Sequence, residues 1–201
     1  MPTFPRTVRP RRPRLPMQPG GLFSFGESNK GQFRSTAARG RQWTEVYPPL
    51  SPADPVHRAW LAEVLDYWMN GTIVDVVHPA FPLLGAGGGT PLVNGATQTG
   101  SSLITDGWPN STLVLKKGDI LRWGTSFVRD VLADATTNGS GQVTLTLGPG
   151  ILSGGSPADN APLLVGAACY FRCRIIDLQM PDSLDATAWY GDCQITFREA
   201  P

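Results

Sequence analysis

One segment of the chain has the apolar spacing of an amphipathic helix. Ser51 or Asp54 can cap its first turn, and Pro55 suits the first helical position. Asn70-Gly71 is a typical helix ending. The sequence therefore predicts one helix at about 55–69. Its apolar residues recur at helical intervals and are Ala59, Leu61, Ala62, Val64, Leu65 and Trp68.

Most of the remaining pattern favours β-strands. Residues 41–47 alternate, with Trp43, Glu45 and Tyr47 on one side of the predicted strand, and residues 72–77 are rich in β-branched side chains. Valine and leucine alternate with threonine directly after the turn sequence Asn138-Gly139-Ser140-Gly141, which predicts a hairpin. Two longer strands are predicted at about 169–178 and 192–199.

The pattern predicts a mainly β fold with one helix and an inserted β domain. A glycine-rich junction, 81–95, precedes a stretch of short strands and evenly spaced turns. We expect a β-sandwich-like first domain from 22–80 plus 166–201. A small β-barrel-like domain at 90–165 is inserted into it, and residues 1–21 precede both as an extended arm.

Charge separates the arm from the body of the chain. Residues 1–42 carry nine basic residues against Glu27 alone, so the remaining residues, with eight basic and fifteen acidic, are net negative. Proline recurs through the arm at positions 2, 5, 10, 13, 16 and 19, which forbids a helix and favours an extended, polyproline-like segment. Its arginines are Arg6, Arg9, Arg11, Arg12 and Arg14.

Three interpretations of the arm stay open: a solvated tail, docking along a neighbouring subunit or partner, and contact with nucleic acid. The aromatic residues that stack on bases are sparse here, because Phe4 is the only ring before Phe23. We take the five arginines as a partner-contact site. We also expect residues 1–16 to become ordered only across a subunit boundary.

The residues that carry chemistry form no recognisable catalytic or metal-binding pattern. Cys169, Cys173 and Cys193 lack CxxC spacing and fall on apolar strand faces, where cysteine is usually a small buried hydrophobe. His57 and His78 each follow an aspartate by three residues, which favours local pairing over a metal site. We therefore predict no enzyme activity, no cofactor and no metal.

Composition narrows the class of protein further. No stretch approaches about 20 consecutive apolar residues, so no membrane-spanning helix is predicted. Only 16% of residues are charged, below the roughly 25% of typical globular domains, so partner copies are expected to cover part of the surface. The six tryptophans could form a platform for sugars, and a carbohydrate-binding module is a second hypothesis.

Ordered blocks of the sequence resemble one family. Trp43 in a strand, followed by YPPLSPADPVHRAWLAEVLDYWMNGTIVDVVHP, is similar to the strand, turn, helix and strand near the start of tail-tip proteins of long-tailed bacteriophages. GTPLVNGATQTGSSLITDGWPNSTLVLKKGDILRWG, VLADATTNGSGQVTLTLGPGI and GSPADNAPLLV resemble the inserted β domain of these proteins, and ITFREAP resembles their last strand. The resemblance spans about 40–201, and the arm lies outside it.

The resemblance implies a virion structural protein like the distal tail protein, a ring between the tail tube and the host-contacting tip. The expected partners are copies of the chain in a ring, taken as a hexamer, together with the tail tube protein and tip or hub proteins. The expected location is the tail tip of the virion, assembled in the host cytoplasm. Two alternatives stay open: a tip module that binds a host surface glycan, and a ring at the neck or tail terminus.

Overall fold

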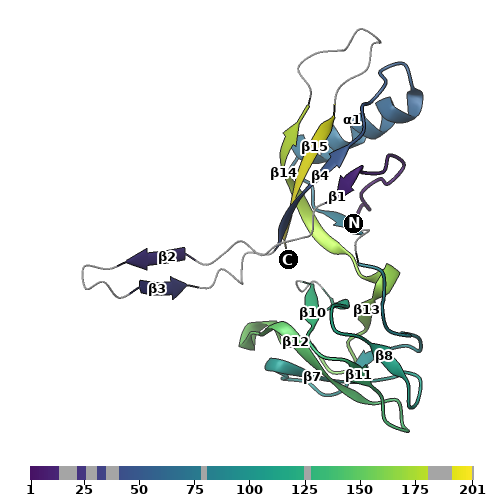
Figure 1. Cartoon of the computed structure of the whole chain (residues 1–201), viewed down its shortest axis with the longest axis vertical. Helices are drawn as coiled ribbons and strands as arrows, with labels where there is room; N and C mark the ends of the chain where they lie inside the picture. The colour runs from purple at the N-terminus through teal and green to yellow at the C-terminus, as the bar shows by residue number, and fades with distance from the viewer. Residues whose placement is uncertain are drawn as a thin grey trace. The chain divides into compact units, whose positions relative to one another are not determined.

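A computed structural model describes residues 1–13, 22–25, 31–34, 41–77, 81–124, 128–180 and 192–200 (Figure 1). The fold is mainly β, with 40% of residues in strands and 13% helical, which confirms the predicted fold class. The chain divides into two compact units, the first being Met1–Val76 with Arg172–Pro201 and the second Val77–Phe171. The inserted domain predicted at 90–165 lies inside the second unit.

The first unit is built on a curled five-stranded sheet of order β1-β4-β15-β14-β5. Antiparallel pairing of β4 with β15 places Trp43 opposite Phe197 and Thr44 opposite Thr196, whose hydroxyls lie 3.0 Å apart. The strands are β1 (Arg12–Pro13), β4 (Gln42–Tyr47), β5 (Val74–Val76), β14 (Phe171–Gln179) and β15 (Cys193–Glu199).

The helix α1 runs from Pro55 to Met69, as the sequence predicts. The Asp54 side chain accepts a hydrogen bond from the Val56 N–H at 2.8 Å, and the helix ends at Asn70. Its buried face is Trp60, Val64 and Tyr67, and the Trp60 ring lies 4.7 Å from that of Tyr47. Of the predicted apolar stripe only Val64 is buried. Leu61 and Leu65 are half-buried, and the other predicted positions are exposed.

The N-terminal segment, residues 1–13, hydrogen-bonds to both edges of this sheet. At one edge the Phe4 N–H donates to the Asp75 carbonyl at 2.9 Å, and the Asp75 N–H donates to the Pro2 carbonyl at 3.0 Å. At the other edge the Arg11 N–H donates to the Val46 carbonyl at 2.7 Å, and β1 continues this pairing with β4. The segment therefore crosses from β5 to β4 and closes the curled sheet.

Residues 1–13 also contribute to the hydrophobic core. Phe4 and Val8 are buried. The Phe4 ring packs edge-on against Phe197, with centroids 5.0 Å apart, and against Trp60 at 6.4 Å. The Trp60 indole N–H donates to the Pro5 carbonyl at 3.0 Å. The expectation that this segment orders only across a subunit boundary is wrong for residues 1–13, because its own sheet supplies the burial and backbone bonds that offset its ordering entropy.

The second unit contains a nearly closed β-barrel-like sheet of order β13-β9-β10-β12-β7-β6. Its two edges approach each other, because the Val93 N–H donates to the Ala161 carbonyl and the Leu163 N–H to the Pro91 carbonyl, both at 2.9 Å. The strands are β6 (Leu92–Val93), β7 (Gly100–Asp106), β9 (Ile120–Trp123), β10 (Arg129–Val131), β12 (Val143–Ile151) and β13 (Leu163–Val165).

Smaller elements complete the described part of the chain. In the second unit, β8 (Leu113–Leu115) pairs with β11 (Ala135–Thr136), and two short 3-10 helices follow, η2 (Ser153–Gly155) and η3 (Gly166–Ala168). The barrel core gathers Leu103, Trp108, Leu121, Leu145 and Leu147 among other buried apolar residues. In the first unit, β2 (Leu22–Phe25) and β3 (Gly31–Arg34) form a separate two-stranded sheet.

Because each unit has its own buried apolar core, we expect each to fold without the other. β5 and β14 are neighbours in one sheet, so a short Gly/Ser linker can replace residues 77–171. That shortened chain should give a β-type circular dichroism spectrum and a cooperative unfolding transition, as should residues 77–171 alone. If the shortened chain aggregates and residues 77–171 alone are unfolded, the two-unit description is wrong.

Loss of the Phe4 ring should destabilise the first unit, because the ring fills a buried site between Phe197 and Trp60. Phe4→Ala should lower the free energy of unfolding by about 3–5 kcal/mol, as measured by urea denaturation. Thr7→Ala, an exposed position in the same segment, is the matched control and should change it by less than about 0.5 kcal/mol. Equal values for the two variants would mean that the segment is not part of the core.

Candidate functional site

Arg6 forms a buried ionic cluster with the first unit's own sheet. Its Nη1 and Nη2 donate to the two carboxylate oxygens of Glu45, the latter at 3.0 Å, and the Glu45 side chain is fully buried. The Tyr47 hydroxyl donates to Glu45 Oε2 at 2.6 Å, and the Trp43 indole N–H donates to Oε1 at 3.1 Å. Arg6 is therefore paired within its own chain, and its role as a contact with a neighbouring subunit stays a prediction.

The cluster holds Glu45 in its ionised form. Burial alone would raise the pKa of this carboxyl. Arg6 lowers it through its hydrogen bonds and positive charge, and Tyr47 and Trp43 lower it through hydrogen bonds. Their combined effect is larger than that of burial, so the pKa lies below its ordinary value. Burial and the adjacent carboxylate together raise the pKa of the Tyr47 hydroxyl, which stays a donor. The sequence analysis did not predict this ion pair. The available signal was Glu45, a carboxylate between Trp43 and Tyr47 on one face of the strand, because a buried carboxylate needs a positively charged partner.

The other predicted contact arginines lie in different surroundings. Arg11 forms an exposed ion pair with Asp192 at 3.5 Å, and such pairs contribute little to stability. Arg9 is exposed. The backbone of Arg12 pairs with Val46 in β1, while Arg14 lies outside the described residues. Among the described side chains, Arg6, Arg9 and Arg11 thus lie in different surroundings, and the contact role of the five arginines stays a prediction.

The β2–β3 hairpin forms a sheet of its own. Its antiparallel register pairs Phe23 with Phe33 and Phe25 with Gly31. No other strand in the described part of the chain pairs with this hairpin. An isolated two-stranded hairpin is marginally stable in water.

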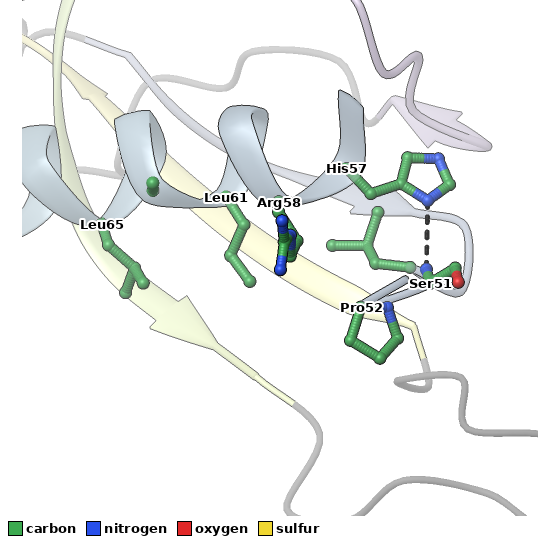
Figure 2. A pocket seen from close by; sticks show the side chains of 8 residues that line it. Ser51, Pro52, His57, Arg58, Leu61 and Leu65 are labelled. Atoms are coloured by element: carbon green, nitrogen blue, oxygen red, sulfur yellow. Dashed lines mark hydrogen bonds between the residues drawn. The ribbon is translucent and has the colours of Figure 1, made fainter. Parts of the chain in front are cut away.

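An apolar groove runs beside the first half of α1. It encloses about 280 Å³, and its walls are the helix and the turn that precedes it. The lining residues are Leu50, Ser51, Pro52, His57, Arg58, Leu61, Ala62 and Leu65. Figure 2 shows Leu61 and Leu65 directed from one side of the helix toward the groove. At its end the Ser51 N–H donates to His57 Nδ1 at 3.0 Å, which fixes the turn against the helix.

A more polar depression lies on the barrel of the second unit. It encloses about 530 Å³, and its hydrogen-bonding residues are Asp134, Thr136, Asn138, Gln142 and Thr144. Part of this polar capacity is already used, because Asn138 Oδ1 accepts from the Ser140 and Gln142 N–H groups, both at 2.9 Å. The surface could bind hydroxyl-rich molecules, although no tryptophan lines it.

The remaining candidates from the sequence are mostly structural. The three cysteines are free and buried, as predicted, and burial raises the pKa of the Cys193 thiol to about 12. Of the described tryptophans, 43, 60, 108 and 123 are buried and Trp68 is 40% exposed, so no sugar platform forms among them. His57 is locally paired, as predicted, and His78 lies outside the described residues.

Among the described residues, no group of three or more His, Cys, Asp or Glu is placed to hold a metal ion. No helix in this part of the chain is long and apolar enough to cross a membrane.

Comparison of the sequence with protein-family models and with curated proteins found no match. The function must therefore be argued from the residues and their geometry.

The Arg6–Glu45 pair should make stability depend on pH. A carboxyl whose pKa is lowered in the folded state stabilises the fold fully above its unfolded-state pKa, near 4.5, and loses that contribution as the pH falls through the folded-state pKa. Glu45→Gln should therefore lower the free energy of unfolding by about 3 kcal/mol at pH 7, because Arg6 loses its partner.

The difference between wild type and Glu45→Gln should shrink steadily below about pH 4.5, as measured by urea denaturation at a series of pH values. Asp177→Asn, which removes an exposed carboxylate from β14 of the same sheet, is the matched control. A Glu45→Gln deficit that is constant from pH 7 to pH 3 would show that the ion pair does not carry this stability.

Proposed function

We propose that this chain is a structural protein of the tail tip of a long-tailed bacteriophage. In this role copies of the chain form a ring between the tail tube and the host-contacting tip. Its partners are further copies of itself, taken as six in the ring, the tail tube protein, and tip or hub proteins. It acts in the virion after assembly in the host cytoplasm. We assign it no catalytic role, and that assignment stays a prediction.

The placement of the family-like blocks supports this proposal. The block from Trp43 to Val77 covers β4, α1 and β5 without interruption. The blocks between 89 and 165 supply strands of the barrel-like sheet, and ITFRE lies in β15 beside β4. Each resembling segment therefore contributes strands or the helix to a two-unit β fold.

The observation that carries the proposal is the β2–β3 hairpin. It forms a separate two-stranded sheet, and no other described strand pairs with it. Such an element gains stability when a second protein surface covers it. Rings arise when an element of one copy contacts a different surface of the next, and the contacts close. The low content of charged residues, 16%, also favours a ring, because surface with few charges is suited to contact with another copy.

Native mass spectrometry of the purified chain tests the proposal. Because a ring closes, the spectrum should contain one discrete multimer of the 21.6 kDa chain, with few species of intermediate size. The multimer should persist as the protein is diluted through the micromolar range. A chain that stays monomeric throughout that range would contradict a self-assembling ring.

A second function, binding of a host surface glycan, is favoured by the polar depression on the barrel. Thr136, Gln142 and Thr144 offer exposed hydrogen-bonding groups that suit sugar hydroxyls. A ring at the neck or tail terminus differs from the main proposal in location only. Binding to an array of bacterial surface polysaccharides that Gln142→Ala abolishes would favour the glycan function.

A further inference from the structure

We infer that α1 is a docking surface for α1 of a second copy, with the two helices antiparallel and a twofold axis at Ala62. The described chain leaves one side of this helix uncovered, and the residues on that side are complementary to themselves when two copies meet head to tail. The inference goes beyond the proposed function. A ring closes through contacts between different surfaces, whereas a twofold contact joins two copies of the same surface.

The uncovered side of α1 is a continuous, mostly apolar stripe. With 3.6 residues per turn, six residues fall within about 120° of the helix circumference. We call them the open side of α1. The first unit buries a different side of the helix, which carries Trp60, Val64 and Tyr67. The residues of the open side are Arg58, Leu61, Ala62, Leu65, Trp68 and Met69.

Solvent reaches large apolar side chains along this open side. Met69 is 76% exposed and Trp68 is 40% exposed. Leu61 and Leu65 are half-buried, and Figure 2 shows both directed from the helix toward the groove. A contiguous exposed apolar surface of this kind is typical of a protein contact. The partner therefore needs an apolar surface that can lie along a helix.

A row of charged and small residues identifies a second copy as that partner. Arg58, Ala62 and Asp66 are spaced by four residues, so they form one ridge along α1. The ridge is positive at one end, negative at the other and small at its midpoint. When a second α1 crosses antiparallel at Ala62, Arg58 of each copy lies level with the partner's Asp66. The charges of the ridge are therefore complementary to those of the same ridge in a second copy, which fixes the orientation.

Both charged side chains are available for this contact. Arg58 and Asp66 are exposed, and neither forms an ion pair with another described residue. One oxygen of Asp66 accepts a hydrogen bond from the Asn70 side chain at 2.8 Å, which leaves the other for a guanidinium of the partner. Glu63 lies outside the open side and accepts from the Tyr67 hydroxyl at 2.5 Å. The pair that joins the two copies is therefore Arg58 with Asp66.

The same crossing point brings the apolar side chains together. Because the helices are antiparallel, Leu61 of each copy lies within one turn of the partner's Leu61 and of the partner's Leu65. Trp68 reaches the level of the groove end that Pro52 and His57 form in the other copy. The small side chain of Ala62 lets the two helix axes approach closely at the crossing. Each copy thus covers the groove and the open side of the other.

Cysteine cross-linking tests the twofold axis. Ala62→Cys should give a disulfide-linked dimer on mild oxidation, because the axis places the two changed residues next to each other, whereas the three native cysteines are buried. Ala59→Cys is the matched control. It is also exposed on α1 but lies outside the open side, and it should stay largely unlinked on a non-reducing gel. No dimer from Ala62→Cys, or equal linking of both variants, would overturn the inference.

Charge reversal tests the pairing between copies. Arg58→Asp alone and Asp66→Arg alone should each weaken self-association about tenfold in analytical ultracentrifugation, because two attractive pairs become repulsive. The two changes in one chain should restore the wild-type dissociation constant, because the pairs form again between copies. Both residues are exposed, so thermal unfolding of the monomer should stay the same. Single changes without effect, or a double change that restores nothing, would contradict this pairing.

Native mass spectrometry of the same variants separates this contact from the proposed ring. A wild-type multimer whose Ala62→Cys variant gives no cross-link would leave the ring standing and overturn the contact. A cross-linked dimer of a chain that forms no larger multimer would support the contact and overturn the ring. A monomer without the cross-link would leave the open side to a different protein and overturn both.

Discussion

The Glu45 carboxylate, buried in the first unit, is the constraint on which the rest of that unit depends. An ionised carboxylate is costly to bury unless it is paired and fully hydrogen-bonded, and Arg6 supplies the charge that pairs with it. Because Arg6 lies within residues 1–13, this segment must cross the sheet before Glu45 of β4 can be buried. In crossing it, they deliver Phe4 to the aromatic core and use the free backbone groups at both sheet edges. Phe4 and Val8 of this segment are thus part of the unit's interior.

The helix α1 packs on this sheet with only one of its apolar sides. Trp60, Val64 and Tyr67 are buried, while Leu61 and Leu65 line the groove beside the helix. The first set completes the core of the unit, and the second stays at its surface.

The sequence was most informative where a pattern is local. Asp54, Pro55 and Asn70 mark the ends of α1, and strand alternation placed the three cysteines in the core. The burial of Phe4 and Val8 was not predicted, because the proline spacing around them indicates an exposed extended segment and two residues are too few to form an apolar pattern. The Arg6–Glu45 pair joins residues far apart in sequence, which no local rule detects. The groove beside α1 was not predicted. The helical spacing of apolar residues does not distinguish the side that the sheet buries from the side that lines the groove.

Hydrogen exchange measured by mass spectrometry, on the monomer and on the assembled multimer, tests the central claim most directly. In both states the amides of Phe4, Arg11 and Asp75 should be protected about as strongly as those of β4 and β15, because they close the sheet. Random-coil exchange of residues 1–13 in the folded monomer would contradict the account.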